Sequence, residues 1–178
     1  MVISLNDRQY LLDNLNRTTA ALETEISGLT DAQWHFRESA DRWSIAQVIE
    51  HLGIYEFLYR KEVAVIVYSR PEPALNNKND SFYLAWMAET KPHTAAGLGL
   101  PQGLMHGADN WIYFKSLREQ NVAFITSTPD DLRAIFTYRP NNERWSIHQL
   151  YIILFAHCDR HLKQILKIKS NPAYPAKD

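Results

Sequence analysis

The sequence predicts an all-α protein, a four-helix bundle in which a long crossover joins the second helix to the third. Apolar side chains recur at steps of three, four and seven residues along long stretches, with charged side chains between them. Serine and threonine capping motifs stand at the starts of several helical stretches. A segment rich in proline and glycine divides the stretches into two pairs, as a bundle with non-alternating helix directions requires.

The first helix is expected over residues 6–29, where the repeated apolar residues lie on one face. A short capped turn should follow it. Thr30 can act as the N-cap, and the side chain of Gln33, three residues later, can accept a hydrogen bond from the cap backbone N–H.

Two of the long helices are expected to open with nearly the same six residues. Arg42-Trp43-Ser44-Ile45-Ala46-Gln47 begins the second helix, over about residues 43–68, and Arg144-Trp145-Ser146-Ile147-His148-Gln149 begins the fourth, over about residues 145–169. In both, the serine and the glutamine three residues later have the spacing of a capping box. The repeat leaves two interpretations open, a true internal duplication or the reuse of a good cap.

The crossover is expected over residues 71–109, where only residues 81–89 suggest a helix. So long a connection within a compact domain indicates either a functional segment or a bundle of non-alternating topology. The third long helix is expected over residues 111–126, and Thr128-Pro129 should cap another short turn.

Composition favours one domain spanning residues 1–178. The chain has 46% hydrophobic residues, enough for a sizeable core. Its formal charge is −1, from 19 basic and 20 acidic residues without long runs of either sign, which argues against nucleic acid as a partner. The sequence shows neither a signal peptide nor a stretch that could span a membrane, so we expect a cytoplasmic protein. The single cysteine, Cys158, cannot form an internal disulfide.

Three histidines are the candidate metal ligands. His157 and His161 lie four residues apart and therefore share one helix face, which apolar residues extend towards the core. His51 lies on the apolar side of the second helix, and the rings can meet if the two helices are staggered or run in opposite directions. A shared metal would satisfy one nitrogen of each ring, although core histidines satisfied by other partners remain the alternative.

The residues Trp43-Ser44-Ile45, then His51-Leu52, and later His157, His161-Leu162 and Gln164-Ile165, carry a family resemblance. In order and length they resemble the DinB-like superfamily of bacterial damage-inducible metal-binding bundles, over nearly the whole chain. The resemblance implies an up-down-down-up four-helix bundle, usually dimeric, with one histidine from the second helix and two from the last holding a metal such as nickel or zinc. By motif match these ligands are His51, His157 and His161.

The resemblance also implies classes of activity. Some members of the superfamily are transferases that depend on bacillithiol, mycothiol or glutathione. The maleylpyruvate isomerase branch uses a glutamate ligand, and the absence of glutamate from both last-helix ligand positions here counts against that branch.

These residues lead to an expected function. Three neutral imidazoles leave a divalent transition metal ion, nickel or zinc first and iron or manganese next, with positions open to water or substrate. The ion could then activate a low-molecular-weight thiol or water against a small electrophile held by aromatic side chains. We expect a thiol S-transferase of a stress or detoxification response, or else a hydrolase. A metal-binding or sensor protein without turnover is the alternative, and a homodimer is expected in each case.

The other candidate residues carry weaker expectations. Glu50 and Glu56 flank His51 and could orient a ligand or act as a base, although surface carboxylates are commoner. Cys158 is expected to be a buried thiol. Histidines in turns and loops are expected to be solvated: His35, His93, His106 and His148.

Overall fold

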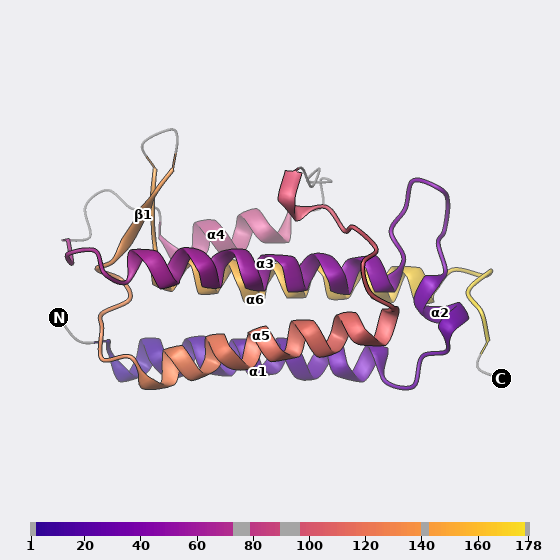
Figure 1. Cartoon of the computed structure of the whole chain (residues 1–178), viewed down its shortest axis with the longest axis horizontal. Coiled ribbons are helices and arrows are strands. Elements are labelled where there is room, and N and C mark those ends of the chain that lie inside the picture. Colours follow the sequence, from indigo (N-terminus) through magenta and orange to yellow (C-terminus); the bar gives the residue numbers. More distant parts are fainter. Residues whose placement is uncertain (1–2, 73–78, 90–96, 140–142, 177–178) are drawn as a thin grey trace.

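The computed structural model describes residues 3–72, 79–89, 97–139 and 143–176, and four long helices form its framework (Figure 1). They are α1 (Leu5–Ile26), α3 (Ile45–Ile66), α5 (Gly107–Ser127) and α6 (Ile147–Lys169). Helices α1 and α6 run in one direction, and α3 and α5 run in the other (Figure 1). The expected four-helix bundle with up-down-down-up topology is therefore confirmed.

The crossover and the ends of the bundle carry the shorter elements. Helix α2 (Asp31–His35) is the capped turn expected after the first helix, and α4 (Asp80–Ala88) is the helix expected within the crossover. The 3-10 helix η1 (Gly97–Gly99) follows it. Helix α4 packs on α6 (Figure 1).

A small antiparallel hairpin precedes α6 and was not predicted. Its strands are β1 (Phe136–Tyr138) and β2 (Arg144–Ser146), with Thr137 paired to Trp145. A short turn follows Thr128-Pro129 as expected: the Thr128 hydroxyl accepts a hydrogen bond from the Asp130 N–H at 3.2 Å, and the turn is non-helical and leads into the hairpin.

Capping boxes fix the starts of three helices. The hydroxyls of Thr30, Ser44 and Ser146 each accept a hydrogen bond from the backbone N–H three residues later. The side-chain oxygen of the glutamine at that position accepts one from the backbone N–H of the cap residue. These reciprocal bonds satisfy donors that a helix start leaves unpaired. The two six-residue repeats thus begin helices as expected, but α3 follows a loop and α6 follows a strand.

A buried ion pair lies in the core between the helices. Arg118 of α5 and Glu56 of α3 are both buried, and their side chains are bonded to each other. Arg118 Nη1 also donates to the carbonyl of Leu15 at 2.9 Å, and Asn121 Nδ2 donates to Glu56 Oε2 at 2.7 Å. Burial disfavours the guanidinium charge, but the charge of Glu56 and the other polar contacts of the guanidinium together outweigh burial and raise the pKa of Arg118 above its ordinary value.

Within the described ranges, no helix combines the length and the apolar character needed to cross a lipid bilayer.

Candidate metal centre

The three candidate histidines converge inside the bundle. One ring nitrogen from each of His51, His157 and His161 lies within 4.8 Å of the others. The Nε2 atom of His157 is 3.1 Å from Nε2 of His51 and 2.9 Å from Nε2 of His161. This convergence is possible because α3 and α6 are antiparallel, which brings the beginning of α3 beside the later turns of α6.

All three rings are largely removed from solvent. The exposed fractions are 4% for His51, 9% for His157 and 7% for His161. His157 and His161 share a face because they are one helical turn apart, and the same face carries buried Leu154 and Ile165. The helix thus directs both imidazoles towards α3.

Hydrogen bonds at the far side of two rings fix their tautomers. His51 Nδ1 lies 2.6 Å from the Gly99 carbonyl oxygen, and His161 Nδ1 lies 2.8 Å from Oε1 of Gln164. Because both of these oxygens can only accept, each Nδ1 carries the hydrogen. In the neutral rings, Nε2 of His51 and of His161 therefore presents a lone pair to the centre.

Burial keeps these rings neutral. It lowers the pKa of His51, although the hydrogen bond to Gly99 acts in the opposite direction. It also lowers the pKa of His161 to about 3, and repulsion from His51 contributes to the same shift. At neutral pH both rings are therefore unprotonated at Nε2.

The arrangement fits a metal ion by its donor chemistry. The lone pairs of His51 and His161 both face Nε2 of His157, which has room for only one hydrogen and can satisfy only one of them. A cation placed among the three nitrogens would satisfy all of them. Neutral imidazoles are common ligands of zinc, nickel and other first-row transition metals. No carboxylate or thiol among the described residues joins the three histidines as a further candidate ligand.

Aromatic side chains wall the three rings. The centroid of the Trp43 ring is 4.8 Å from that of His51, and Trp43 also stacks on His161 at 6.4 Å. The Tyr55 ring lies 4.9 Å from His51 and 4.8 Å from His157. Trp43, which directly precedes the N-cap of α3, therefore borders the histidine cluster.

The expectation that Glu50 and Glu56 are surface carboxylates was wrong. Both are buried, and both are engaged away from the three rings. Glu56 pairs with Arg118 in the core. Glu50 accepts hydrogen bonds from the backbone N–H groups of Gln102 and Gly103, at 2.8 and 2.9 Å.

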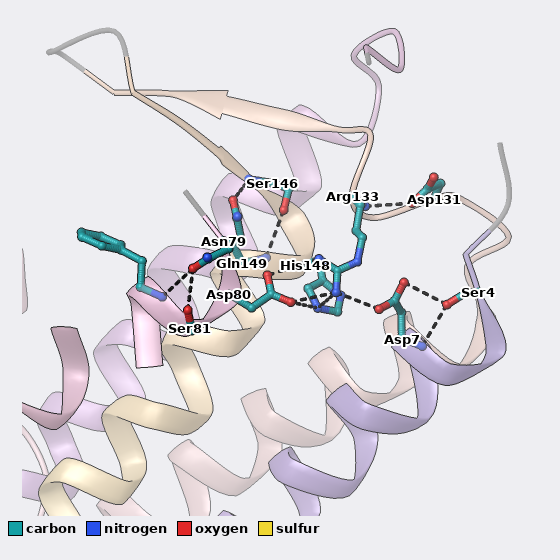
Figure 2. Close-up of polar contacts among 11 residues, drawn as sticks. Ser4, Asp7, Asn79, Asp80, Ser81, Asp131, Arg133, Ser146, His148 and Gln149 are labelled. Atoms are coloured by element: carbon teal, nitrogen blue, oxygen red, sulfur yellow. Dashed lines mark hydrogen bonds and ion pairs between the residues drawn. The ribbon is translucent and has the colours of Figure 1, made fainter. Parts of the chain in front are cut away.

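The expectation of a solvated His148 was also wrong. His148 is fully buried near the start of α6, with Nε2 2.8 Å from a guanidinium nitrogen of Arg133 (Figure 2). Arg133 also contacts Asp7 and Asp80, so this histidine belongs to a polar cluster separate from the three converging histidines (Figure 2).

The remaining candidates lie outside the cluster. His35 on α2 and His106 at the start of α5 are exposed, as expected, while His93 lies outside the described residues. Cys158 is buried, as expected, and its Sγ lies 3.1 Å from Nη2 of Arg118. Burial raises the pKa of the Cys158 thiol to about 11, which keeps it protonated at neutral pH.

A cavity of about 400 Å³ lies between α2, the start of α3 and the start of α5. Glu50, Gly103 and Asn110 line it together with exposed His35 and His106. None of the three converging histidines is among its lining residues.

Known proteins resemble this chain in sequence and in fold. A sequence model of the DinB superfamily matches residues 14–165. The uncharacterized protein YuaE of Bacillus subtilis (strain 168) is 26% identical over 152 residues, which make up 84% of this chain and 93% of YuaE. YfiT from Bacillus subtilis, described as a probable metal-dependent hydrolase with an unusual four-helix bundle topology, has a similar fold. Its structure matches with a TM-score of 0.60 at 18% identity, over 94% of this chain and 88% of YfiT. The match to the superfamily covers most of the chain, and the protein therefore belongs to the DinB superfamily.

Proposed function

We propose that the protein is a metal-dependent hydrolase in which His51, His157 and His161 hold one divalent transition metal ion. The observation that carries the proposal is the convergence of three imidazole nitrogens, two of which have their Nε2 lone pairs fixed towards the centre. Three neutral protein ligands leave coordination positions for other molecules, an arrangement typical of catalytic rather than structural metal sites. The description of YfiT as a probable metal-dependent hydrolase supports the same class of activity.

The bound ion would supply Lewis-acid activation of water, or of a thiol, at neutral pH. The chain's own residues would hold the ion and position the substrate. The buried imidazoles hold the ion without adding negative charge, so its full dipositive charge remains available. Trp43 and Tyr55 provide aromatic faces beside the rings, which suit the apolar part of a small electrophile.

A thiol S-transferase would use the same open positions. A low-molecular-weight thiol, bound in place of water, would be the nucleophile in that case. Nickel and zinc are the first candidate ions, with iron and manganese next, because imidazole ligands suit all of these metals to different degrees.

The second candidate is a metal-binding protein without turnover. The positions of Glu50 and Glu56 favour it, because both carboxylates near His51 on α3 are held by other groups and are not free to act as a base. A homodimer is proposed in either case.

The test begins with the metal content of protein purified without a histidine tag. We expect close to one nickel, zinc, iron or manganese ion per chain, and loss of that ion in a His157→Ala, His161→Ala double variant. Full occupancy in the double variant would exclude the proposed ligands. Mutating exposed His35 and His106 to alanine provides the control, because these histidines lie outside the cluster.

Activity is then measured on the metal-loaded protein with a panel of chromogenic esters and amides, with and without added thiols. Hydrolysis that disappears on chelation and in His157→Ala supports the hydrolase. Turnover that requires a thiol indicates the transferase instead. A fully loaded protein that turns over none of these substrates would favour the binding protein.

A further inference from the structure

Two neighbouring residues of α3 hold the same segment of the crossover. We call this segment, residues 97–105, the strap. Its Gly99 carbonyl oxygen lies 2.6 Å from Nδ1 of His51. Glu50, the residue before this histidine, accepts hydrogen bonds from the next part of the strap, at 2.8 Å from the Gln102 N–H and at 2.9 and 3.0 Å from the Gly103 N–H. The strap therefore has two anchors only a few residues apart.

The Glu50 anchor is strong because its carboxylate is buried. The side chain is only 4% exposed, and among the described residues its partners are these backbone N–H groups rather than a basic side chain. A buried carboxylate is costly unless it is hydrogen-bonded, and hydrogen bonds to an ionised acceptor are about twice as strong as neutral ones. Displacing the strap would leave that charge without its donors.

The backbone of the strap is shaped for both contacts. Gly103 has φ +68°, a left-handed conformation that other residues adopt at a cost, and it directs the N–H to both carboxylate oxygens. Gly99 packs so closely on Tyr55 that an added Cβ would lie 2.9 Å from the tyrosine hydroxyl oxygen. The absence of a side chain at Gly99 thus lets its carbonyl reach His51.

The Gly99 carbonyl decides which nitrogen of His51 can bind metal. While the carbonyl accepts from Nδ1–H, Nε2 keeps its lone pair and faces His157. If the carbonyl moved away, the neutral ring could also carry its hydrogen on Nε2, and a protonated Nε2 cannot be a ligand. Partners that fix a ligand histidine in this way typically change metal affinity by about 10- to 100-fold when they are removed.

We infer that Glu50 is a positioning residue of the metal centre. It holds the strap in place by hydrogen bonds, so that the Gly99 carbonyl keeps Nε2 of His51 free for the ion. Glu50 neither touches the ion nor transfers a proton in this role. The inference rests on the proposed function, since it assigns to Glu50 a part in assembling the proposed site.

The test reads the tautomer of His51 directly, by nitrogen-15 NMR of the imidazoles in the metal-free, full-length protein. In the wild type, the hydrogen of His51 should reside on Nδ1. In Glu50→Ala the His51 signals should move towards a mixture of tautomers, while those of His161, held by Gln164, should stay unchanged. Glu50→Gln keeps an acceptor oxygen and should give an intermediate result. Metal affinity, measured by competition with a chelating dye, should fall by about 10- to 100-fold in Glu50→Ala.

Matched variants separate positioning from a general loss of stability. Gly103→Ala strains the left-handed backbone whose N–H binds Glu50, and it should reproduce the shift of the His51 signals. Gly28→Ala places the same strain at φ +64°, at the end of α1, and should leave them unchanged. Glu62→Gln removes a carboxylate of α3 that pairs with Arg139 and should also have no effect on His51.

An unchanged His51 tautomer in both Glu50→Ala and Gly103→Ala would overturn the inference. Should Glu50→Ala fail to fold, Glu50→Gln and Gly103→Ala decide the question in the same spectra. Failure of the proposed function can be told apart from failure of this inference. A wild type that binds no metal would still show whether the hydrogen bonds between Glu50 and the strap set the tautomer of His51.

Discussion

Gln164 lies one helical turn beyond His161, with its Oε1 atom 2.8 Å from Nδ1 of that ring. This contact does for His161 what the Gly99 carbonyl does for His51. Gln164→Leu should therefore lower metal affinity by about 10- to 100-fold, because the His161 ring would lose the partner that fixes its tautomer. A competition titration against a chelating dye measures the effect. Exposed Lys163→Leu on the same turn is the control, and equal affinities of the two variants would contradict the prediction.

Removing the proposed metal should lower the melting temperature of the protein without unfolding it at room temperature. A bundle of four helices with 21 to 23 residues each has its own core, unlike a small domain that folds only with its metal. An ion that binds only the native state would add RT ln(1 + [L]/Kd) to stability. Chelation should lower Tm and leave helical circular dichroism intact at room temperature. The His157→Ala, His161→Ala variant should show no such response, and a chelator-sensitive melting point in that variant would contradict the assignment.

The buried ion pair should be sensitive to the loss of one partner alone. Arg118→Met leaves the Glu56 carboxylate buried without its cation and should reduce the free energy of unfolding by about 3 to 5 kcal/mol. Adding Glu56→Met in the same chain removes the stranded charge and should restore part of that loss. Urea denaturation measures both variants. A double variant less stable than Arg118→Met would show that the carboxylate does not carry the cost.

Stability should depend on acid pH through Asp80. Burial opposes the ionised form, but the hydrogen bonds from His148 and Arg133 prevail and hold the pKa of Asp80 below its ordinary value (Figure 2). A carboxyl group with a lowered folded-state pKa stabilises the protein above its unfolded value, about 3.9, and this contribution is lost as pH falls below that value. Asp80→Asn should therefore lower Tm at neutral pH, with a difference that shrinks below about pH 4.

The control for that titration is Asp41→Asn, at an exposed position in the turn before α3. It should change Tm little at any pH. A Tm difference for Asp80→Asn that stayed constant across the acid range would mean that the carboxylate charge is not what stabilises the cluster.

The proposed dimer can be tested on the outer face of α5. Ile112 is 65% exposed there, and an interface that covered it would bury its apolar side chain. Light scattering should show a dimer at micromolar concentration for the wild type and for Ile112→Leu. Ile112→Asp should shift the population towards monomer without loss of helix. A monomeric wild type would refute the dimer itself.

The fold could be read from the sequence because its signals are local. Capping residues such as Ser44 and Ser146 stand within a turn of the helices that they start, and apolar spacing marks the buried face of each helix. The sequence did not predict the hairpin because strands of three residues are too short to show an alternating pattern of apolar and polar residues.

The surroundings of the site were harder to predict than its histidines. The spacing of His157 and His161 fixes their shared face, whereas the partner of His51 is the backbone carbonyl of Gly99, and a carbonyl leaves no mark in a sequence. The burial of Glu50 likewise depends on N–H groups 52 and 53 residues away. Gln164 was different, because it lies on the same helix as the histidine that it orients.

Arg118 links all four long helices, and this constrains the order of folding. It contacts Glu56 on α3, Cys158 on α6 and the Leu15 carbonyl on α1, at sequence separations of 62, 40 and 103 residues. Helices α3 and α5 alone can pair the guanidinium with Glu56, but no pair of helices supplies all of its partners, so an intermediate that buried Arg118 early would leave some of its N–H groups without acceptors. The rate-limiting step of folding should therefore come late on the pathway, when α1, α3 and α6 have all packed around α5. For a helical protein, folding should accordingly be slow and all-or-none, with the rate set by long-range closure rather than by helix formation.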